Sequence, residues 1–237
     1  MLLILFLFGT IIYLAFKSNK IADQNRLWAG MAKETAHQIG TPLSSLLGWV
    51  ALLRMENASE ETVSEIEKDV SRLNTIADRF SKIGSVPKLT RHDVVEETRV
   101  AFDYIRSRSF KQIEFQFNTL NDKPIYVDLN PQLYSWVIEN LVKNAIDAMS
   151  GKGSLEISVF QENNTAVITV TDSGKGIPKR LQKKIFEPGY TTKQRGWGLG
   201  LSLTKRIIED YNKGKIFVKR SEIGGGTTFM IQMKVSE

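Results

Sequence analysis

The sequence predicts a multidomain α+β protein made of an N-terminal membrane helix, a helical hairpin that dimerises into a four-helix bundle, and an α/β sandwich. Three observations predict this fold class. Residues Met1 to Phe16 carry no charge. Two runs with a heptad pattern of apolar residues follow between residues 21 and 80. Beyond residue 87, strand and helix patterns are mixed. The length of 237 residues suits one ordinary domain and a smaller one.

The composition excludes several kinds of site. The chain has no cysteine, which excludes a disulfide scaffold, a thiol nucleophile and a cysteine-based zinc site. Its two histidines, His37 and His92, are too few for a histidine-rich metal site. The net charge is +6, but acidic residues are interspersed among the basic ones and no aromatic-flanked basic stripe occurs. We therefore expect no nucleic-acid partner, and a basic surface also suits a protein beside an anionic membrane leaflet.

The N-terminal run predicts a membrane anchor. As a helix, residues Met1 to Phe16 would span roughly 24 Å, slightly less than a hydrocarbon core of about 30 Å. The basic region and the small-residue cleavage site of a signal peptide are not visible. Lys17, Lys20 and Arg26 follow the run, so the positive-inside bias predicts that the rest lies in the cytoplasm. We expect a single-pass anchor in the cytoplasmic membrane, with the lipid bilayer as a partner; a cleaved signal or a buried helix is the alternative.

The next region predicts two amphipathic helices. The apolar seam of the first consists of Ile39, Leu43, Leu46, Val50 and Leu53. After a polar break at residues 56–59, the second seam consists of Val63, Ile66, Val70, Leu73, Ala77 and Phe80. Such helices with a short connection form an antiparallel hairpin. Because one hairpin cannot cover its own apolar stripe, we expect a homodimeric four-helix bundle.

The last region predicts one mixed sheet with helices on one face. Residues 84–87 form an interdomain linker, and His92 is expected to be an ordinary histidine in the linker region. Helices are expected at 93–108, 131–149 and 201–211, and strands at 113–117, 125–127, 155–160, 166–171, 216–218 and 228–235. Pro131 suits the first turn of a helix, and Asn163-Asn164 and the 224–229 segment are typical of hairpin turns.

Four short segments carry residues suited to chemistry. The first contains Asn140 and Asn144, one helical turn apart, whose amide oxygens could complete the coordination of Mg²⁺. In isolation, two such asparagines are ordinarily solvated. The second contains Asp172, Gly174 and Gly176 directly after a strand. Its glycines allow backbone to approach a ligand and its carboxylate could accept a hydrogen bond from an exocyclic amine, although a strand-ending turn would look the same.

The other two segments offer groups for phosphate. Residues 186–193 join an apolar anchor, Phe186, to a polar loop in which Lys193 and Arg195 are available. Residues 196–201 have three glycines and open the following helix. Backbone N–H groups at a helix N-terminus attract phosphate, although a glycine-rich stretch alone is weak evidence.

In this order and spacing, the segments resemble the N, G1, F, G2 and G3 boxes of the GHKL ATPase superfamily, and specifically of its histidine kinases, over residues 86–235. The resemblance implies a Bergerat-type sandwich that uses ATP and Mg²⁺. It implies that Asp172 reads adenine, that Asn144 is the Mg²⁺ ligand, and that Asn140 and Lys143 lie near the phosphates. The other ATP-binding residues that it implies are Gly174, Gly176, Ile177, Phe186, Thr192, Lys193, Gly196, Gly198, Leu199, Gly200, Leu201 and Thr227. Residues 187–200 would form the ATP lid.

One sequence position distinguishes the ATP-hydrolysing members of the superfamily from its histidine kinases. ATP-hydrolysing members of the superfamily, such as gyrase, carry a glutamate base one turn before the Mg²⁺ asparagine. Here that position holds Asn140, which cannot take a proton from water. The adjacent Glu139 points about 100° away around the helix. This favours phosphoryl transfer over hydrolysis.

The phosphoacceptor is predicted in the first helix of the hairpin, where residues 37–43 resemble the H box of the HisKA dimerisation and phosphotransfer domain. The helical pattern agrees, because His37 precedes seam residue Ile39 by two positions and points away from the bundle core. Pro42 lacks an N–H group and should loosen the helix there. The implied domains are an anchor (1–16), a signalling linker helix (17–33), a dimerisation and phosphotransfer domain (34–85) and a catalytic ATP-binding domain (86–237).

The H box departs from the family at Gln38, where an acidic residue usually takes the proton of the imidazole. Glutamine can orient the ring but cannot act as a base, so our hypothesis is that solvent takes the proton. Thr41 matches a position linked to dephosphorylation, and Gln38 leaves phosphatase activity open.

The sequence therefore predicts a sensor histidine kinase of a two-component system, which phosphorylates His37 and passes the phosphate to an aspartate of a response-regulator receiver domain. An ATP-binding scaffold without activity and a GHKL hydrolase remain as alternatives.

Overall fold

The computed structural model describes residues 4, 6–14, 42–55, 59–83, 87–109, 112–120, 123–193 and 198–236. The chain divides into two compact units, Met1–Pro87 and Lys88–Glu237. Each has a hydrophobic cluster of its own.

The N-terminal segment of the first unit is helical over residues 6–14, and its large apolar side chains are exposed. Within the part of the chain that the structure describes, no helix combines the length and the hydropathy needed to cross a membrane.

The predicted hairpin is confirmed for the described residues. A helix covers residues 42–55, and α2 runs from Glu60 to Ile83. A buried cluster joins the two helices through one seam position of each heptad: Leu43, Val50, Val63, Val70 and Ala77. The seam residues between them, Leu46 and Leu73, are 40% and 42% exposed. Two further seam residues, Leu53 and Ile66, pack partly buried against this cluster. The hairpin therefore covers most of the described seam and leaves Leu46 and Leu73 partly exposed.

The second unit begins with a strand that the sequence analysis missed. Strand β1, Thr90–Asp93, pairs antiparallel with β3, Tyr126–Leu129, as a separate two-stranded sheet. Two expectations are therefore wrong: the 125–127 strand does not belong to the main sheet, and His92 lies in β1 and not in a linker. All four β1 side chains are polar, so the strand lacks the apolar alternation that would have indicated it.

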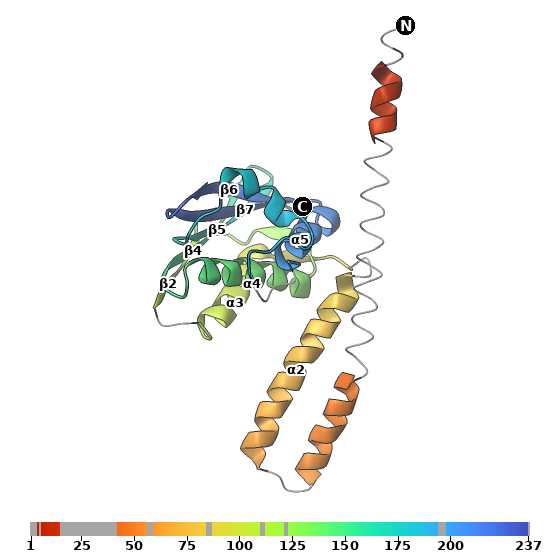
Figure 1. Cartoon of the computed structure of the whole chain (residues 1–237), viewed down its shortest axis with the longest axis vertical. Helices are drawn as coiled ribbons and strands as arrows, with labels where there is room; N and C mark the ends of the chain where they lie inside the picture. The colour runs from red at the N-terminus through yellow and green to blue at the C-terminus, as the bar shows by residue number, and fades with distance from the viewer. Residues whose placement is uncertain are drawn as a thin grey trace. The chain divides into compact units, whose positions relative to one another are not determined.

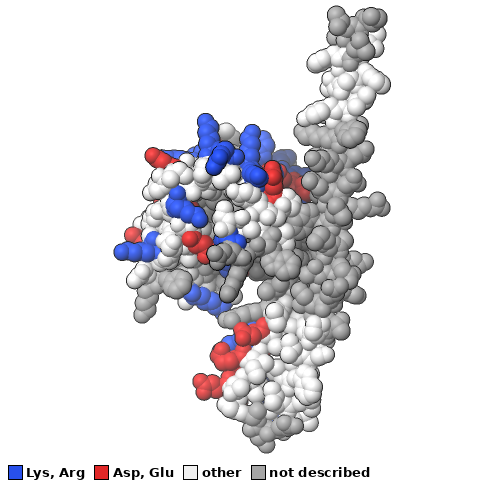
Figure 2. All heavy atoms as spheres, in the orientation of Figure 1, with Lys and Arg blue, Asp and Glu red and all other residues white. Residues whose placement is uncertain are grey.

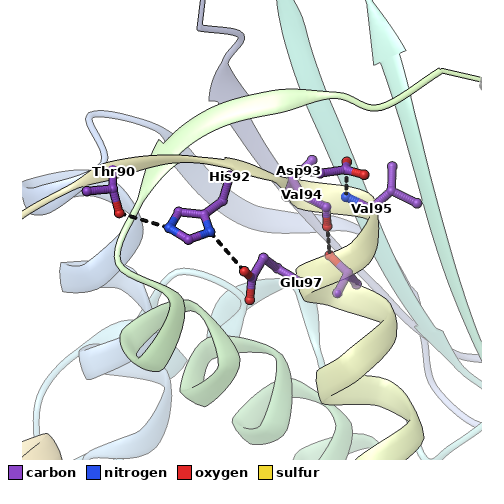
Figure 3. A network of polar contacts seen from close by, with 7 residues as sticks. Thr90, His92, Asp93, Val94, Val95 and Glu97 are labelled. Atoms are coloured by element: carbon purple, nitrogen blue, oxygen red, sulfur yellow. Dashed lines mark hydrogen bonds and ion pairs between the residues drawn. The ribbon is translucent and has the colours of Figure 1, made fainter.

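Polar contacts fasten β1 to the helix that follows it (Figure 3). The His92 ring lies between Thr90 and Glu97, with Nε2 2.8 Å from the threonine hydroxyl and Nδ1 3.0 Å from the carboxylate. Asp93 caps helix α3, Val94–Arg106, by accepting a hydrogen bond from the backbone N–H of Val95. The histidine thus has a structural role.

The main sheet has five strands in the order β2-β4-β5-β7-β6, and α3 and α4 cover one face of it (Figure 1). The strand bounds are Ile113–Thr119 (β2), Gly153–Glu162 (β4), Thr165–Asp172 (β5), Lys215–Glu222 (β6) and Gly226–Lys234 (β7). Strand β2 is parallel to β4, and the other pairs are antiparallel. This confirms the predicted mixed sheet with helices on one face.

Helix α4, Pro131–Ala148, carries the candidate asparagines, and its start is well defined. The side chain of Asn130 accepts a hydrogen bond from the N–H of Leu133 (3.2 Å), and Pro131 fits the first turn. The same Asn130 side chain donates through Nδ2 to the carbonyl oxygen of Lys88 (3.3 Å). One residue therefore links the start of the unit to α4.

The helix expected at 201–211 is present but is not regular. It begins as α5, Gly200–Arg206, and continues as π-helical turns, η3, over Ile207–Tyr211. Two short 3₁₀ turns, η1 (Lys179–Leu181) and η2 (Lys184–Phe186), connect β5 to the glycine-rich segment.

Candidate functional site

Asn140 projects from α4 toward α5. Its Nδ2 donates a hydrogen bond to the hydroxyl of Thr204, 2.8 Å away. Gly200 lies against the same amide, and a Cβ atom there would come within 2.4 Å of Asn140 Oδ1. A side chain at position 200 would therefore displace the Asn140 amide from its place. The buried Thr204 was missed by the sequence analysis, because no local pattern indicates its approach to α4.

Asn144, one turn later, faces a cationic side chain. Its Oδ1 accepts a hydrogen bond from Lys193 Nζ at 3.0 Å, and the same ammonium contacts the carboxylate of Asp147. Amide and carboxylate oxygens thus converge on a positive charge, which is the donor set that a hard divalent cation prefers. The residues fit Mg²⁺ in this respect. Asp147 was also missed, although its place three residues after Asn144 puts it on the same helix face.

No group of three or more His, Cys, Asp or Glu side chains suited to a metal occurs in the described ranges. Mg²⁺ is commonly held in proteins by few side chains, with phosphates and water as its other ligands.

Asp172 ends β5 and is buried beside two backbone donors. Its Oδ1 accepts a hydrogen bond from the N–H of Gly174 at 2.8 Å, and Thr227 is its register partner on β7. Burial raises the pKa of this carboxyl group, and the backbone hydrogen bonds from Gly174 and Thr227 oppose the shift. The Asp172 carboxyl group can therefore accept a hydrogen bond, in surroundings that disfavour its negative charge.

The glycines after Asp172 are required by close packing. A Cβ atom at Gly174 would come within 2.7 Å of the backbone carbon of Ala148, at the end of α4. Gly176 has a φ of +73°, and a Cβ there would come within 1.9 Å of the carbonyl oxygen of Glu222. The segment therefore lies between the end of α4 and the β6–β7 turn.

Hydrogen bonds extend this packing to Thr227. The N–H of Ile177 donates to the hydroxyl of Ser221 (2.7 Å), which lies 2.8 Å from the hydroxyl of the buried Thr227. Phe186 is buried and meets Phe229 edge to face, with ring centroids 6.2 Å apart. Both predicted residues, Thr227 and Phe186, thus support the site from the sheet side.

The glycine-rich segment closes on itself at the backbone. The N–H of Gly189 donates to the carbonyl oxygen of Gly198 at 3.1 Å. Gly198 has a φ of +65°, and a Cβ there would come within 2.4 Å of the Gly189 carbonyl carbon. Thr192 is exposed, and Leu201 packs against the core. The backbone of Leu199 accepts hydrogen bonds in the first turn of α5.

Some predicted residues do not join this arrangement. The Lys143 side chain is exposed and lies 3.6 Å from Glu139, one turn earlier on α4. Glu139 itself is buried and accepts a hydrogen bond from the hydroxyl of Ser135. The predicted residues His37, Gln38, Thr41 and Gly196 lie outside the described residues.

Comparison with known proteins identifies the relatives of this arrangement. The family of histidine kinase-, DNA gyrase B- and HSP90-like ATPases matches residues 130–237. Sporulation kinase D of Bacillus subtilis (strain 168) is 31% identical over 226 residues, which cover 93% of this chain and 44% of that protein. The catalytic domain of the histidine kinase ThkA is 33% identical, with a TM-score of 0.55, over 62% of this chain and 96% of that domain.

A larger solved structure extends the likeness to more of the chain. The histidine kinase ThkA in complex with the response regulator protein TrrA matches 94% of this chain and 66% of that chain, with 26% identity and a TM-score of 0.60. The chain spans less than half the length of the sporulation kinase.

Proposed function

Because the chain belongs to the family of histidine kinase-, DNA gyrase B- and HSP90-like ATPases, we propose that it is a sensor histidine kinase of a two-component system. In this proposal the chain phosphorylates its own His37 from ATP and transfers the phosphate to a receiver-domain aspartate. The observation that carries the proposal is that one helix, α4, meets all three polar segments. Asn140 contacts α5, Asn144 contacts Lys193, and the end of α4 packs on Gly174 beside Asp172.

Each segment then has a role in binding the nucleotide. The Asp172 carboxylate accepts a hydrogen bond from the amine of adenine, and Gly174 and Gly176 let backbone approach the ring. Lys193 lies near the phosphates and neutralises their charge, and the exposed Lys143 has to turn from Glu139 toward them to do the same. Asn144 would hold Mg²⁺, which when bound supplies further neutralisation of the β- and γ-phosphates.

The transfer step needs an outward-facing imidazole. One ring nitrogen of His37 attacks the γ-phosphorus while the bond to the β–γ bridging oxygen breaks, so that ADP leaves as the phosphohistidine forms. Gln38 orients the ring, and solvent takes the proton from the other nitrogen. A carboxylate oxygen of the receiver-domain aspartate then attacks the phosphorus, the P–N bond to His37 breaks, and the leaving imidazole takes up a proton from solvent.

Two side chains of α4 disfavour hydrolysis of ATP by water. Asn140, in the position of a hydrolytic base, uses its amide to bind Thr204 and cannot accept a proton from water. Glu139 is buried and is held by Ser135 and Lys143 on its own helix. Neither side chain is suited to activate a water molecule.

Dimerisation and membrane attachment are further parts of the proposal. The exposed Leu46 and Leu73 support pairing of the hairpin with a second copy, because burial of the remaining exposed surface of each would contribute about 1 kcal/mol. The uncharged run Met1 to Phe16, with the cations after it, supports a single-pass anchor in the cytoplasmic membrane.

Incubation with γ-labelled ATP tests the function. Wild type should gain acid-labile label, His37→Ala should gain none, and His92→Ala should label normally, because His92 binds Thr90 and Glu97 far in sequence from the acceptor. No label on wild type would favour an ATP-binding scaffold. Steady phosphate release that does not depend on His37 would favour a hydrolase.

A further inference from the structure

The positive charge of the chain is concentrated in one short stretch of the second unit. Residues 88–237 carry 23 Lys and Arg against 17 Asp and Glu, whereas residues 1–87 carry nine of each. Within residues 175–184 there is no acidic residue and there are five basic ones, here called the basic patch: Lys175, Lys179, Arg180, Lys183 and Lys184. All five are exposed. Lys and Arg gather on the corresponding part of the surface, over the segment between β5 and α5 (Figure 2).

The basic patch is not neutralised by its surroundings. None of its five side chains forms an ion pair with another residue that the structure describes, although eight ion pairs occur elsewhere in the described ranges. The Lys184 ammonium group lies over the ring of Tyr190, 5.7 Å from its centroid. Five cations held close together without counter-charges favour an anionic partner.

A large apolar side chain projects beside the basic patch. Ile223, in the turn between β6 and β7, is 67% exposed. The turn is fastened to the patch, because the N–H of Gly224 donates to the carbonyl oxygen of Lys175 at 3.0 Å. Strand β6 is the edge of the sheet and also exposes Phe217 and Lys219. The surface therefore combines cations with an apolar tip.

This combination distinguishes between anionic partners. Nucleic acid would attract the cations, but its phosphates and bases offer little to an exposed isoleucine. The interfacial zone of an anionic bilayer binds both the cations and the apolar side chain. Lipid headgroups attract the cations, and the boundary of the acyl chains takes up the isoleucine. We propose that the basic patch and Ile223 form a docking surface for an anionic phospholipid membrane. This goes beyond the proposed function and relies on its membrane anchor only to keep a bilayer within reach.

The absence of cysteine makes a direct test possible. Ile223→Cys places a single thiol at the tip for an environment-sensitive dye. The matched control is Asn163→Cys, in the β4–β5 turn at the opposite end of the sheet, as the pairing of Thr165 with Lys234 and of Asp172 with Thr227 shows. The labelled full chain is reconstituted in vesicles of phosphatidylcholine alone or mixed with phosphatidylglycerol, so the N-terminal segment is common to both.

The dye at 223 should shift to shorter wavelength in anionic vesicles only, and added salt should reverse the shift. Neutralising Lys179, Arg180 and Lys183 to Gln should weaken docking about fivefold for each charge. Neutralising Arg99 and Arg106 on α3, together with Arg108 in the turn after it, should not. The dye at 163 should stay unchanged.

The proposal is overturned if the dye at 223 does not respond, responds equally in neutral vesicles, or responds to duplex DNA or an acidic protein and not to lipid. Labelling of His37 in the same vesicles is measured separately, so that loss of docking and loss of kinase function are distinguished.

Discussion

The ammonium group of Lys193 lies 3.0 Å from the amide oxygen of Asn144 and also contacts the carboxylate of Asp147. A positive charge of the chain itself therefore occupies the position beside the predicted metal ligand. Binding of a metal–nucleotide complex has to displace this ammonium from the two oxygens.

Replacing Asp147 by Asn should release Lys193 without removing it. Because the ion pair is about half exposed, it contributes roughly 1 kcal/mol at most, so affinity for a magnesium complex of a non-hydrolysable ATP analogue should rise by no more than about fivefold. Calorimetric titration measures this. Asp103→Asn, which breaks another exposed pair, with Arg106, is the control and should change nothing. Weaker binding by Asp147→Asn would show instead that this carboxylate assists the nucleotide.

A methyl group at Gly176 should destabilise the second unit. Its Cβ would meet the carbonyl oxygen of Glu222 at 1.9 Å, in addition to the strain of a positive φ. Gly224→Ala provides the comparison, because Gly224 has the same φ of +73° and nothing within 4 Å of the added atom. We expect a loss of about 1 kcal/mol at Gly224 and about 3 kcal/mol or more at Gly176, measured by urea unfolding. Equal losses would mean that the backbone shifts to remove the clash.

The buried Asp172 predicts a pH dependence of stability. Its pKa is raised by burial, so the folded state holds the proton more tightly than the unfolded state. Between the ordinary aspartate pKa and the raised one, the folded state binds more protons, and this carboxyl group makes stability fall as pH rises. The melting temperature of Asp172→Asn relative to wild type should therefore increase across that window and stay constant above it. Parallel curves for the two proteins would contradict the assignment. Nucleotide affinity of the variant should fall.

Because Gln38 cannot act as a base, we expect the rate of autophosphorylation to be limited by proton transfer to solvent. Gln38→Glu would place a carboxylate beside His37, and autophosphorylation near pH 7 should accelerate, on the order of 100-fold at most. Initial rates of label incorporation measure this, with the double variant His37→Ala/Gln38→Glu as the blank. A variant no faster than wild type would refute the account in which solvent takes the proton.

The two exposed seam residues of the hairpin, Leu46 and Leu73, predict how added charge changes the affinity of the dimer. Lysine at both Leu46 and Leu73 should raise the dissociation constant of the dimer by about 100-fold or more, because two apolar side chains no longer leave water on association. Lysine at Leu47, which is exposed outside the seam, should have little effect. Sedimentation equilibrium of the three proteins measures this. A wild type that is already monomeric would contradict the proposed dimer.

Much of the fold could be predicted from the sequence because its signals are local. The heptad seams, Pro131 and the asparagine turn at residues 163–164 each act within a few residues. Strand β1 could not be predicted in this way. Its four polar residues form a strand only because β3, more than 30 residues later, pairs with them. The π-helical turns of η3 contain no glycine or proline, so no local signal indicates them.

The same distinction between local and non-local signals applies to the residues of the candidate site. Asn140, Asn144 and Asp172 were predicted because their spacing with glycines is a strong pattern in one dimension. Thr204 was missed, since its contact with Asn140 joins residues 64 positions apart through the packing of two helices. The contact of Lys193 with Asp147 is equally non-local, and only the structure brings them together.

Asn130 gives the second unit a mechanical property. Its amide is fastened at once to the carbonyl of Lys88, where the chain enters the unit, and to the first turn of α4. A displacement of Lys88 would therefore strain the Asn130 amide and, with it, the first turn of the helix that carries Asn144.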